Sequence, residues 1–312
     1  MRYGKRLRTG DTIGFIAPSG AVRTEGSIEC AVAEAQKAGF RVKLGESCGQ
    51  KYGYLSGTDE VRARDVNRMF LDDEVDAIMC VRGGYGTTRM LNLLDYEAIA
   101  AHPKVFMGFS DITAMHIAML QKAELVTFHG PMGVSDWTEP MHPVSFASMM
   151  QAIGATEPMG ALENAPGYRE RRTVNPGQAE GRLVGGNLTL IASLLGTPYE
   201  LDTKGRILFI EEIGEHTYCV DRLLTQLRLA GKFDDCAGVV FGDFNNCQIE
   251  YEQFGLTLEQ IVKDVVAPCG KPIFTGLQSG HCTPKLTLPL GVRCRMDADA
   301  CTLTVLEAAV RA

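Results

Sequence analysis

The most informative part of this chain is the stretch Lys104-Val-Phe-Met-Gly-Phe-Ser-Asp-Ile-Thr-Ala-Met-His-Ile-Ala-Met-Leu120. Its apolar run, 105–107, predicts a buried strand, and Gly108 permits a tight turn. The residues from Asp111 onward predict an amphipathic helix. Ser110 lies at the apex of this strand-turn-helix, where free N–H groups at a helix N-terminus can stabilise an oxyanion. On these residues alone Ser110 is either a nucleophile or a simple N-cap residue.

Short apolar runs alternate with amphipathic segments on both sides of this stretch, through the first half of the chain. Strands are predicted at 12–17, 41–44, 77–81, 105–107 and 125–128, with helices at 27–38, 58–71, from about 87, and after Ser110. This alternation predicts an α/β domain with a parallel sheet covered on both faces. Ligands of such sheets bind beyond the carboxyl ends of the strands. We therefore expect Gly83–Gly86, Ser110 and His129, which all follow strands, along one rim.

The second half of the chain repeats the alternation after an interruption. Residues 153–180 are rich in Pro, Gly, Glu and Arg, which predicts a linker or a long surface loop. Beyond it, strands are predicted at 181–184, 206–210 and 238–242, helices at 188–195, 217–230 and 257–267, and tail strands at 285–290, 291–296 and 301–306. The sequence thus predicts an N-terminal domain over 1–152, a linker over 153–180, and a C-terminal α/β domain with extra antiparallel strands over 181–312.

Composition excludes several classes of protein. Among the 312 residues, 31 basic and 38 acidic side chains give a net charge of −7, without the clustered positive charge that nucleic acids require. The ten cysteines are scattered through apolar runs without metal-ligand spacing, which favours buried free thiols in a reducing compartment. No apolar run has the length of a signal peptide or membrane span. We expect a soluble, cytoplasmic protein with no metal and no nucleic-acid or membrane partner.

A serine nucleophile needs a base and an orienting carboxylate, and the sequence offers one good candidate for each. His281 lies in the polar, glycine-flanked loop 278–284, from which it can project into a cleft; the alternative is an exposed loop residue. Glu211 directly follows an apolar strand, where a carboxylate can be held fixed; the alternative is a residue that caps the following helix. Glu212 should face the other way, because side chains alternate along a strand.

The glycine-rich loop Gly83-Gly84-Tyr85-Gly86 admits three interpretations. A dinucleotide-binding loop matches poorly, because Arg89 stands where the third glycine of G-x-G-x-x-G belongs, and the loop does not follow the first strand. An ordinary tight turn is possible. The third interpretation is that the glycines bring a backbone N–H close to a substrate oxygen, where it is the second donor of an oxyanion hole. This interpretation explains the glycines best. We therefore expect no cofactor, and we count Gly83, Tyr85 and His129 as candidate substrate-binding residues.

Taken together, the motifs resemble the LD-carboxypeptidase family of serine peptidases, which also contains the microcin-C self-immunity peptidases. The resemblance covers nearly the whole chain, and it is specific because of the order and spacing of its parts. These are Gly10-Asp-Thr-Ile-Gly-Phe-Ile-Ala-Pro-Ser19, Val81-Arg-Gly-Gly-Tyr-Gly86, Gly108-Phe-Ser-Asp111, Phe128-His-Gly-Pro131, Gly185-Gly-Asn-Leu188, Leu208-Phe-Ile-Glu-Glu-Ile-Gly-Glu215, Asp221-Arg-Leu-Leu-Thr-Gln-Leu227 and 276–281. One departure is Glu212, where many relatives carry Asp.

The resemblance implies roles for five residues. It assigns the nucleophile to Ser110, the carboxylate to Glu211 and the base to His281, with oxyanion donors at the backbone N–H groups of Gly84 and Asp111. It also implies a Rossmann-like N-terminal domain, a C-terminal domain of β-barrel-like character, and a homodimer. The implied substrate is the murein tetrapeptide, which the enzyme trims of its terminal D-alanine during cell-wall recycling in the cytoplasm.

Other functions remain open on the sequence alone. A microcin-immunity-like enzyme would keep the triad and cleave an aminoacyl-nucleotide amide, and it would need an aromatic stacking surface, for which Trp137 is the candidate. A non-catalytic binding protein and a nucleotide-dependent oxidoreductase are the rivals from other classes. Arg82 and Arg182 are candidates for gripping the substrate carboxylate. The residue that precedes D-alanine, lysine or diaminopimelate, is not specified, nor is whether 153–180 closes over the cleft.

Overall fold

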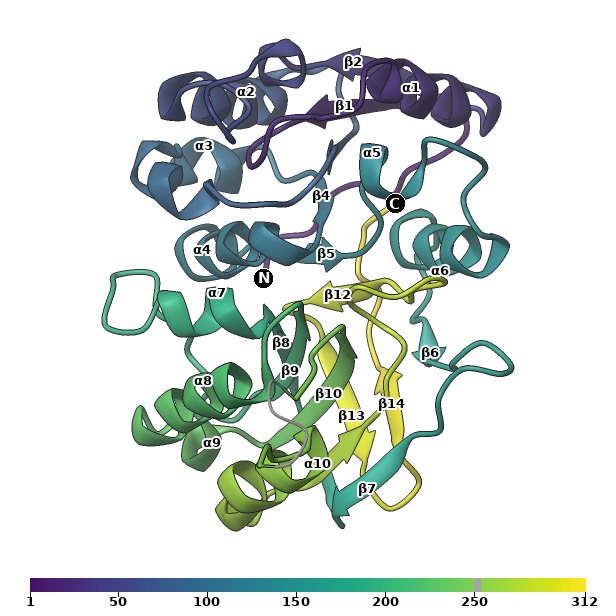
Figure 1. Ribbon diagram of the computed structural model, residues 1–312. Helices are drawn as coiled ribbons and strands as arrows, with labels where there is room; N and C mark the ends of the chain where they lie inside the picture. The colour runs from purple at the N-terminus through teal and green to yellow at the C-terminus, as the bar shows by residue number, and fades with distance from the viewer. Residues whose placement is uncertain (250–253) are drawn as a thin grey trace. The chain divides into compact units, whose positions relative to one another are not determined.

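The computed structural model describes residues 1–249 and 254–312, which form two compact units (Figure 1). Unit 1 comprises Met1–Glu157, Thr287–Gly291 and Ala308–Ala312. Unit 2 comprises Pro158–Leu286 and Val292–Glu307. Two short segments that follow most of unit 2 in the sequence therefore belong to unit 1.

Unit 1 is built around a six-stranded sheet of order β12-β5-β4-β3-β1-β2. Its strands are β1 (Thr12–Ile16), β2 (Arg41–Leu44), β3 (Ala77–Cys80), β4 (Val105–Gly108), β5 (Thr127–His129) and β12 (Leu288–Leu290). Strands β1 to β5 are mutually parallel, and β12 is antiparallel to β5. Every residue of β1, β3 and β4 is buried, as the continuous apolar runs predict for a sheet covered on both faces.

Helices cover both faces of this sheet. They are α1 (Ser27–Lys37), α2 (Asp59–Leu71), α3 (Tyr96–Ala101), α4 (Thr113–Ala123), α5 (Gly133–Asp136) and α6 (Pro143–Gly154). Helices α2, α3 and α4 contact one another in sequence on one face, and α1 contacts α5 on the other (Figure 1). The segment after Gly86, predicted as a helix, begins as the 3₁₀ helix Thr87–Leu93. The predicted Rossmann-like parallel sheet is confirmed.

The strand order places a topological switch point between β1 and β3. From β1 the chain proceeds to β2 on one side, and from β3 it continues to β4 and β5 on the other. Ligands of doubly wound sheets bind outside the carboxyl ends of the strands at such a point. The loops after β1 and β3 meet there, because Gly20 N–H donates to the Gly83 carbonyl at 3.3 Å. The loop after β4, which carries Ser110, is the next one along the same edge.

Unit 2 holds an eight-stranded sheet of order β6-β14-β13-β8-β9-β10-β11-β7. The strands are β6 (Gly160–Ala161), β7 (Arg172–Asn175), β8 (Gln178–Asn187), β9 (Ile207–Ile213), β10 (Gly238–Asn245), β11 (Ile273–Thr275), β13 (Arg293–Asp297) and β14 (Thr302–Val305). Strands β8 to β11 are parallel and the others pair antiparallel. The α/β class with extra antiparallel strands is confirmed. In the described residues the sheet is open, with β6 and β7 at its edges, and does not close into a barrel.

The helices of unit 2 are α7 (Leu188–Ser193), α8 (Thr217–Leu229), α9 (Lys232–Asp235) and α10 (Leu258–Ile261). Helix α10 continues as a π-helical turn, Val262–Val266, where the sequence predicted one regular helix. The predicted linker 153–180 contains β6, β7 and the beginning of β8. The predicted tail strand 285–290 supplies β12, which joins the sheet of unit 1, because hydrophobic alternation does not encode the sheet to which a strand belongs. The functional division at 1–152, 153–180 and 181–312 stays a prediction.

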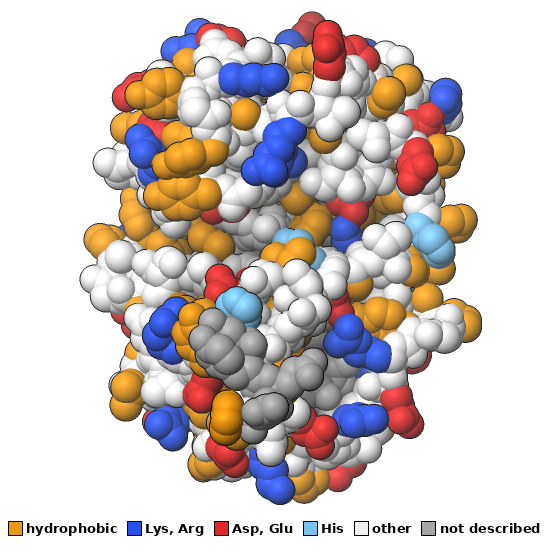
Figure 2. All heavy atoms as spheres, in the orientation of Figure 1, with side chains coloured by type: hydrophobic (Ala, Val, Ile, Leu, Met, Phe, Trp, Pro, Cys, Tyr) orange, Lys and Arg blue, Asp and Glu red, His pale blue; other side chains and the backbone are white. Residues whose placement is uncertain are grey.

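The surface and the thiols agree with the composition. Figure 2 shows Lys, Arg, Asp and Glu side chains interspersed over the face that it draws. All ten cysteines are free, as predicted, but only five of them are buried; four are partly exposed, and Cys30 is exposed because it lies on the outer face of α1. No helix among the described residues is long and apolar enough to cross a membrane.

Candidate active site

Ser110 occupies a strained turn at the end of β4. Its φ of 66° lies in the left-handed region, which costs an L-residue about 1–2 kcal/mol. The 3₁₀ helix Ser110–Ile112 follows at once and runs into α4. Ser110 caps neither helix, because the N-cap positions are Phe109 and Ile112 and neither has a side-chain cap. The half-buried hydroxyl therefore stands on a sharp strand-to-helix turn, the geometry of a nucleophile elbow.

A buried histidine holds the strand end that precedes this turn. His116 lies on α4, is 1% exposed, and its Nε2 lies 2.8 Å from the Gly108 carbonyl oxygen. Burial lowers the pKa of His116 to about 4, although the hydrogen bond to Gly108 opposes this shift. The ring is therefore neutral at pH 7, and a neutral ring satisfies this carbonyl by donating from Nε2. This contact fixes the end of β4 two residues before Ser110.

The glycine loop after β3 lies directly against the serine. A Cβ atom at position 83 would lie 2.9 Å from Ser110 Cβ and 3.1 Å from its Oγ. Gly84 and Gly86 have φ values of 128° and 134°, which side chains rarely tolerate. In the part of the chain that the structure describes, neither Gly84 N–H nor Asp111 N–H donates to a protein acceptor. Two unengaged backbone donors thus lie in the segments that meet at the serine.

The carboxylate of Asp111 connects three loops at this edge of the sheet. Its Oδ2 accepts from Ser19 Oγ at 2.6 Å and from Thr87 N–H at 3.0 Å. Thr87 Oγ1 in turn donates to the Asp111 carbonyl at 2.6 Å. Asp111 is 1% exposed. The turn after β4 is therefore tied to the loop after β1 and to the end of the glycine loop.

Unit 2 carries a hydrogen-bonded carboxylate and histidine. Glu211 Oε2 on β9 lies 2.6 Å from His281 Nδ1; the Glu211 side chain is fully buried and that of His281 is 13% exposed. A carboxylate at Nδ1 keeps the proton on that nitrogen and orients the ring, so that Nε2 at its opposite edge has the character of a base. The alternatives for these two residues do not hold, since the histidine is largely buried and the carboxylate points at it.

The loop that carries His281 is fixed by its neighbours. A Cβ atom at Gly280, where φ is 118°, would lie 2.8 Å from Glu211 Oε2, so only glycine lets the backbone pass the carboxylate. Asn245 Nδ2 donates to the His281 carbonyl at 2.5 Å, and Asp243 N–H donates to the Ser279 carbonyl at 2.9 Å. The end of β10 thus holds the loop against β9.

Glu212 faces the opposite side of β9, as the alternation of side chains predicts. It accepts from Asn187 Nδ2 at 2.8 Å, and from the N–H and hydroxyl of Thr189 at 2.8 and 2.7 Å. Burial raises the pKa of Glu212, while these hydrogen bonds lower it. These hydrogen bonds attach the start of α7 to β9, so Glu212 stabilises the fold of unit 2.

The remaining candidates from the sequence occupy different environments. Tyr85 is 50% exposed and contacts Tyr54, with ring centroids 5.9 Å apart. His129 is 1% exposed, and its ring lies tilted against Phe109 in unit 1. Tyr85 therefore stands at the surface beside the glycine loop, whereas His129 is part of the interior behind the serine turn.

Three further side chains that the sequence singled out are already engaged. Arg82 Nη1 donates to the Ala21 carbonyl at 2.7 Å, and Arg182 Nη1 lies 3.1 Å from a carboxylate oxygen of Glu307. Trp137 is 2% exposed, so it offers no surface on which a base could stack. Sequence reasoning missed Ser19, Thr87 and Asn245. The turn at Ser19 is visible as Pro18-Ser19-Gly20 after the first strand, on the edge where ligands bind.

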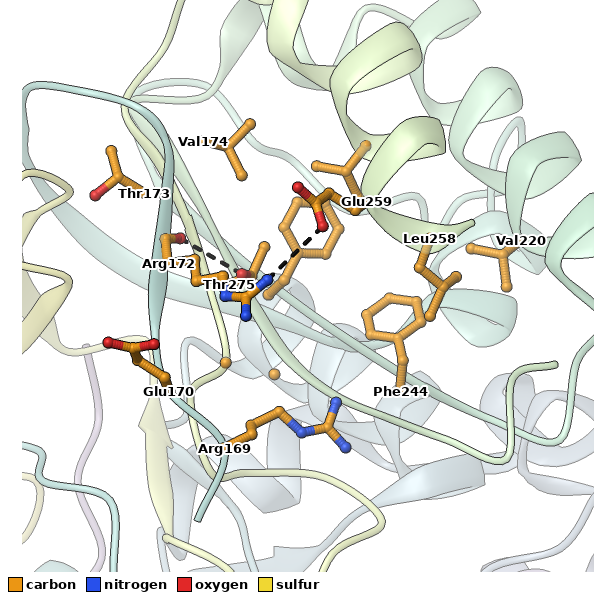
Figure 3. A pocket seen from close by; sticks show the side chains of 14 residues that line it. Arg169, Glu170, Arg172, Thr173, Val174, Val220, Phe244, Leu258, Glu259 and Thr275 are labelled. Carbon is orange, nitrogen blue, oxygen red and sulfur yellow. Dashed lines mark hydrogen bonds and ion pairs between the residues drawn. The ribbon is translucent and has the colours of Figure 1, made fainter. Parts of the chain in front are cut away.

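A cavity of about 390 Å³ lies in unit 2 and is drawn in Figure 3. Three apolar side chains form one wall of the cavity: Phe244, Leu258 and Val220. Beside them, Arg172 Nη1 lies 3.8 Å from Glu259 Oε2. Arg169, also on its lining, pairs through Nη2 with the buried Asp243 at 2.8 Å. Neither Glu211 nor His281 lines this cavity. Arg169 and Arg172 are both paired with carboxylates of the same unit.

Comparisons with known proteins match both units. The model of the LD-carboxypeptidase N-terminal domain matches residues 13–130, and that of the C-terminal domain matches residues 180–296. A probable murein peptide carboxypeptidase of Bacillus subtilis is 42% identical over 98% of this chain and 94% of its own. The solved muramoyltetrapeptide carboxypeptidase of Oxalobacter formigenes is 29% identical, with a TM-score of 0.82 over 94% of this chain and 97% of its own. The microcin C7 self-immunity protein MccF, in complex with aspartyl sulfamoyl adenosine, is 26% identical with a TM-score of 0.89 over 100% of both chains.

Proposed function

The chain belongs to the LD-carboxypeptidase family of serine peptidases, and we propose that it removes the terminal D-alanine from murein tetrapeptides. The bond hydrolysed is the amide between D-alanine and the L-centre of the preceding lysine or meso-diaminopimelate. The observation that carries the proposal is the 2.6 Å hydrogen bond between buried Glu211 and His281, since a carboxylate-oriented histidine is the base that such chemistry needs. The choice of substrate rests on the Bacillus subtilis and Oxalobacter formigenes relatives.

The proposed mechanism is acyl transfer through Ser110. His281, oriented by Glu211, takes the hydroxyl proton as the serine oxygen attacks the carbonyl carbon. The N–H groups of Gly84 and Asp111 stabilise the resulting oxyanion, each by roughly 3–4 kcal/mol in comparable sites. His281 then gives its proton to the departing amine of D-alanine. Water, activated by the same histidine, hydrolyses the acyl-enzyme.

The same proposal includes the surroundings of the reaction. Gly83 and Tyr85 contact the substrate beside the serine, and His129 supports the turn from within unit 1. The enzyme acts in the cytoplasm, in cell-wall recycling, as a homodimer without a metal or cofactor. Analytical ultracentrifugation tests the dimer: a species of twice 33.9 kDa at micromolar concentration supports it, and a monomer contradicts it.

A second candidate function keeps the triad and changes the substrate. The structural neighbour MccF is known in complex with aspartyl sulfamoyl adenosine, which favours an aminoacyl-nucleotide amide as the alternative substrate. Such a substrate calls for an aromatic surface that stacks on the base. Trp137 is buried and does not supply one. We place the muropeptide first because the Bacillus subtilis and Oxalobacter formigenes relatives are carboxypeptidases of murein peptides by name.

Product masses distinguish the two candidates. The wild type and Ser110→Ala are incubated with tetrapeptides that carry L-lysine or meso-diaminopimelate at the third position, and with aspartyl sulfamoyl adenosine. Loss of one alanine residue from a tetrapeptide, by the wild type only, supports the proposal and also reports the preferred third residue. Intact tetrapeptides together with cleaved aspartyl sulfamoyl adenosine would replace it by the second function.

A further inference from the structure

Arg62 is a buried cation that the proposed mechanism does not use. It lies on α2 with a fully buried side chain. Its Nη1 donates to the Pro18 carbonyl at 2.6 Å and to the Gly86 carbonyl at 2.9 Å, and its Nη2 donates to the Asp59 carboxylate. A buried arginine needs a paired charge and partners for most of its N–H groups. Asp59, which also pairs with Arg89, supplies the opposite charge. Nη1 and Nη2 have partners, whereas Nε has none among the described residues. The two carbonyls show which loops the guanidinium connects.

The two carbonyls belong to the loops on either side of the switch point. Pro18 follows β1, and Gly86 closes the glycine loop after β3. Glycine residues leave a loop with large conformational freedom and with no side chains to anchor it. The anchors must therefore come from outside the loop, and the planar fork of an arginine can hold two acceptors in a fixed relation.

Asp111 holds the residues next in sequence to those that Arg62 holds. Arg62 contacts Pro18 and Gly86, while the Asp111 carboxylate contacts Ser19 and Thr87. Each loop is thus held at two successive residues, once by the cation and once by the anion. The two charges also interact: burial lowers the pKa of Arg62, whereas Asp59 and Asp111 raise it.

We propose that Arg62 and the Asp111 carboxylate are positioning residues that jointly fix the Gly83–Gly86 loop against Ser110 and so set the direction of the Gly84 N–H. This inference rests on the proposed function, in which that N–H stabilises the oxyanion. Neither side chain needs to contact the substrate. Their removal should slow the chemical step, because a displacement of about 1 Å at the oxyanion donor lowers the reaction rate on the order of 100-fold.

The test is the rate at which a fluorophosphonate modifies Ser110, since phosphonylation uses the serine, the base and the oxyanion donors without requiring the natural substrate. Arg62→Lys keeps the charge but cannot span both carbonyls, and Asp111→Ala removes the acceptor. We expect the maximal phosphonylation rate of each to fall by about 10- to 100-fold, while the half-saturating concentration changes less than about threefold. Asp111→Asn retains an oxygen that can accept both hydrogen bonds, and it should recover most of the rate.

Matched controls separate positioning from the general cost of altering a buried charge. Arg171→Lys changes another arginine that donates to backbone carbonyls, in unit 2, and Glu212→Gln changes another buried carboxylate that accepts hydrogen bonds from the start of α7. Both should react at the wild-type rate. If Arg62→Lys fails to fold, Ser19→Ala removes one hydroxyl from the same network and should slow the reaction by about three- to tenfold.

The outcomes separate failure of this inference from failure of the proposed function. A wild type that the phosphonate does not modify at Ser110 would overturn the proposed function. A reactive wild type whose folded Arg62→Lys and Asp111→Ala variants react equally fast would overturn the positioning role alone. Equal losses in the Arg171 and Glu212 controls would also overturn it, because the effect would then belong to any buried charge.

Discussion

At the scale of single residues, the serine turn depends on a glycine that no other residue can replace. Ser110 adopts a left-handed φ that raises its energy, and it keeps this conformation only because its surroundings pack closely. Gly83 is one of those surroundings, because a Cβ atom at this position would lie only 2.9 Å from Ser110 Cβ. Strain and close packing at one point are typical of a site in which precise placement of one oxygen matters more than stability.

Gly83→Ala should therefore damage the reaction more than the fold. The new Cβ atom would lie 2.9 Å from Ser110 Cβ, so the serine or the loop must shift. We expect phosphonylation of Ser110 to slow by about 100-fold, with a loss of about 1–3 kcal/mol in the free energy of unfolding. Gly49→Ala, where a Cβ atom meets nothing within 4 Å, is the control. A Gly83→Ala variant with the wild-type rate would show that the contact does not constrain the serine.

At the scale of elements, β9 presents successive glutamates to opposite sides of the strand. Glu211 meets His281, and Glu212 meets the N-terminus of α7. The alternation of side chains along a strand produces this division without any further device. Substitutions at the two positions should therefore have opposite effects.

Glu211→Gln should abolish most of the activity and leave the fold intact. Glu212→Gln should leave the activity nearly unchanged and destabilise the fold. Loss of the carboxylate that orients a catalytic histidine lowers kcat by on the order of 10⁴-fold in comparable sites. Glutamine at position 212 would place its NH₂ group, itself a donor, against donors of Asn187 or Thr189. This should lower the free energy of unfolding by about 1–3 kcal/mol. Urea denaturation and the tetrapeptide assay on both variants measure the two effects. A stable, active Glu211→Gln variant would contradict the assigned roles.

His116 makes the stability of unit 1 depend on pH. Its pKa is about 4 in the folded chain and 6.5 in the unfolded chain. As the pH falls below 6.5, the unfolded chain binds a proton at this histidine and the folded chain does not, so the folded chain loses stability. Between pH 8 and pH 5 the wild type should lose about 2 kcal/mol more unfolding free energy than His116→Gln. The exposed His102→Gln is the control. Parallel urea-stability curves for the wild type and His116→Gln over this range would disprove the prediction.

The elements that the sequence predicts well are those whose pattern is local. The run 105–107 with the turn at Gly108 indicates the serine turn, and the position of Glu211 after an apolar strand indicates its orientation. Arg62 could not be predicted in this way: within Asp59-Glu-Val-Arg-Ala-Arg-Asp65 it has the appearance of a solvated helix face. Its burial depends on two loops that are 44 and 24 residues away in the chain. Contacts of that separation leave no periodic signal.

At the scale of the whole molecule, the end of the chain completes unit 1. Strand β12 pairs with β5 at the edge of the first sheet. The last residues then join the N-terminal segment: Arg6 N–H donates to the Arg311 carbonyl at 2.8 Å, and Arg311 N–H donates to the Gly4 carbonyl at 3.0 Å. Val310, directly before Arg311, is fully buried. Unit 1 therefore combines residues that precede unit 2 in the sequence with residues that follow most of it.

Val310→Asp should destabilise unit 1 although it lies at the end of the chain. An unpaired carboxylate buried there costs several kcal/mol, which corresponds to a fall in Tm of about 10 °C for a unit of this size. Ala312→Asp, at an exposed position, should leave Tm unchanged. Differential scanning calorimetry measures both, and equal Tm values for the two variants would refute the structural role of the C-terminal residues.

Ser110 is the proposed nucleophile, activated by Glu211 and His281. Peptide mapping by mass spectrometry after fluorophosphonate treatment is the decisive measurement. We expect a single phosphonyl group on Ser110 of the wild type, none on Ser110→Ala, and much slower modification of Glu211→Gln and His281→Ala. Modification of another serine, such as Ser19 or Ser279, or labelling of Ser110→Ala at the wild-type rate, would contradict it.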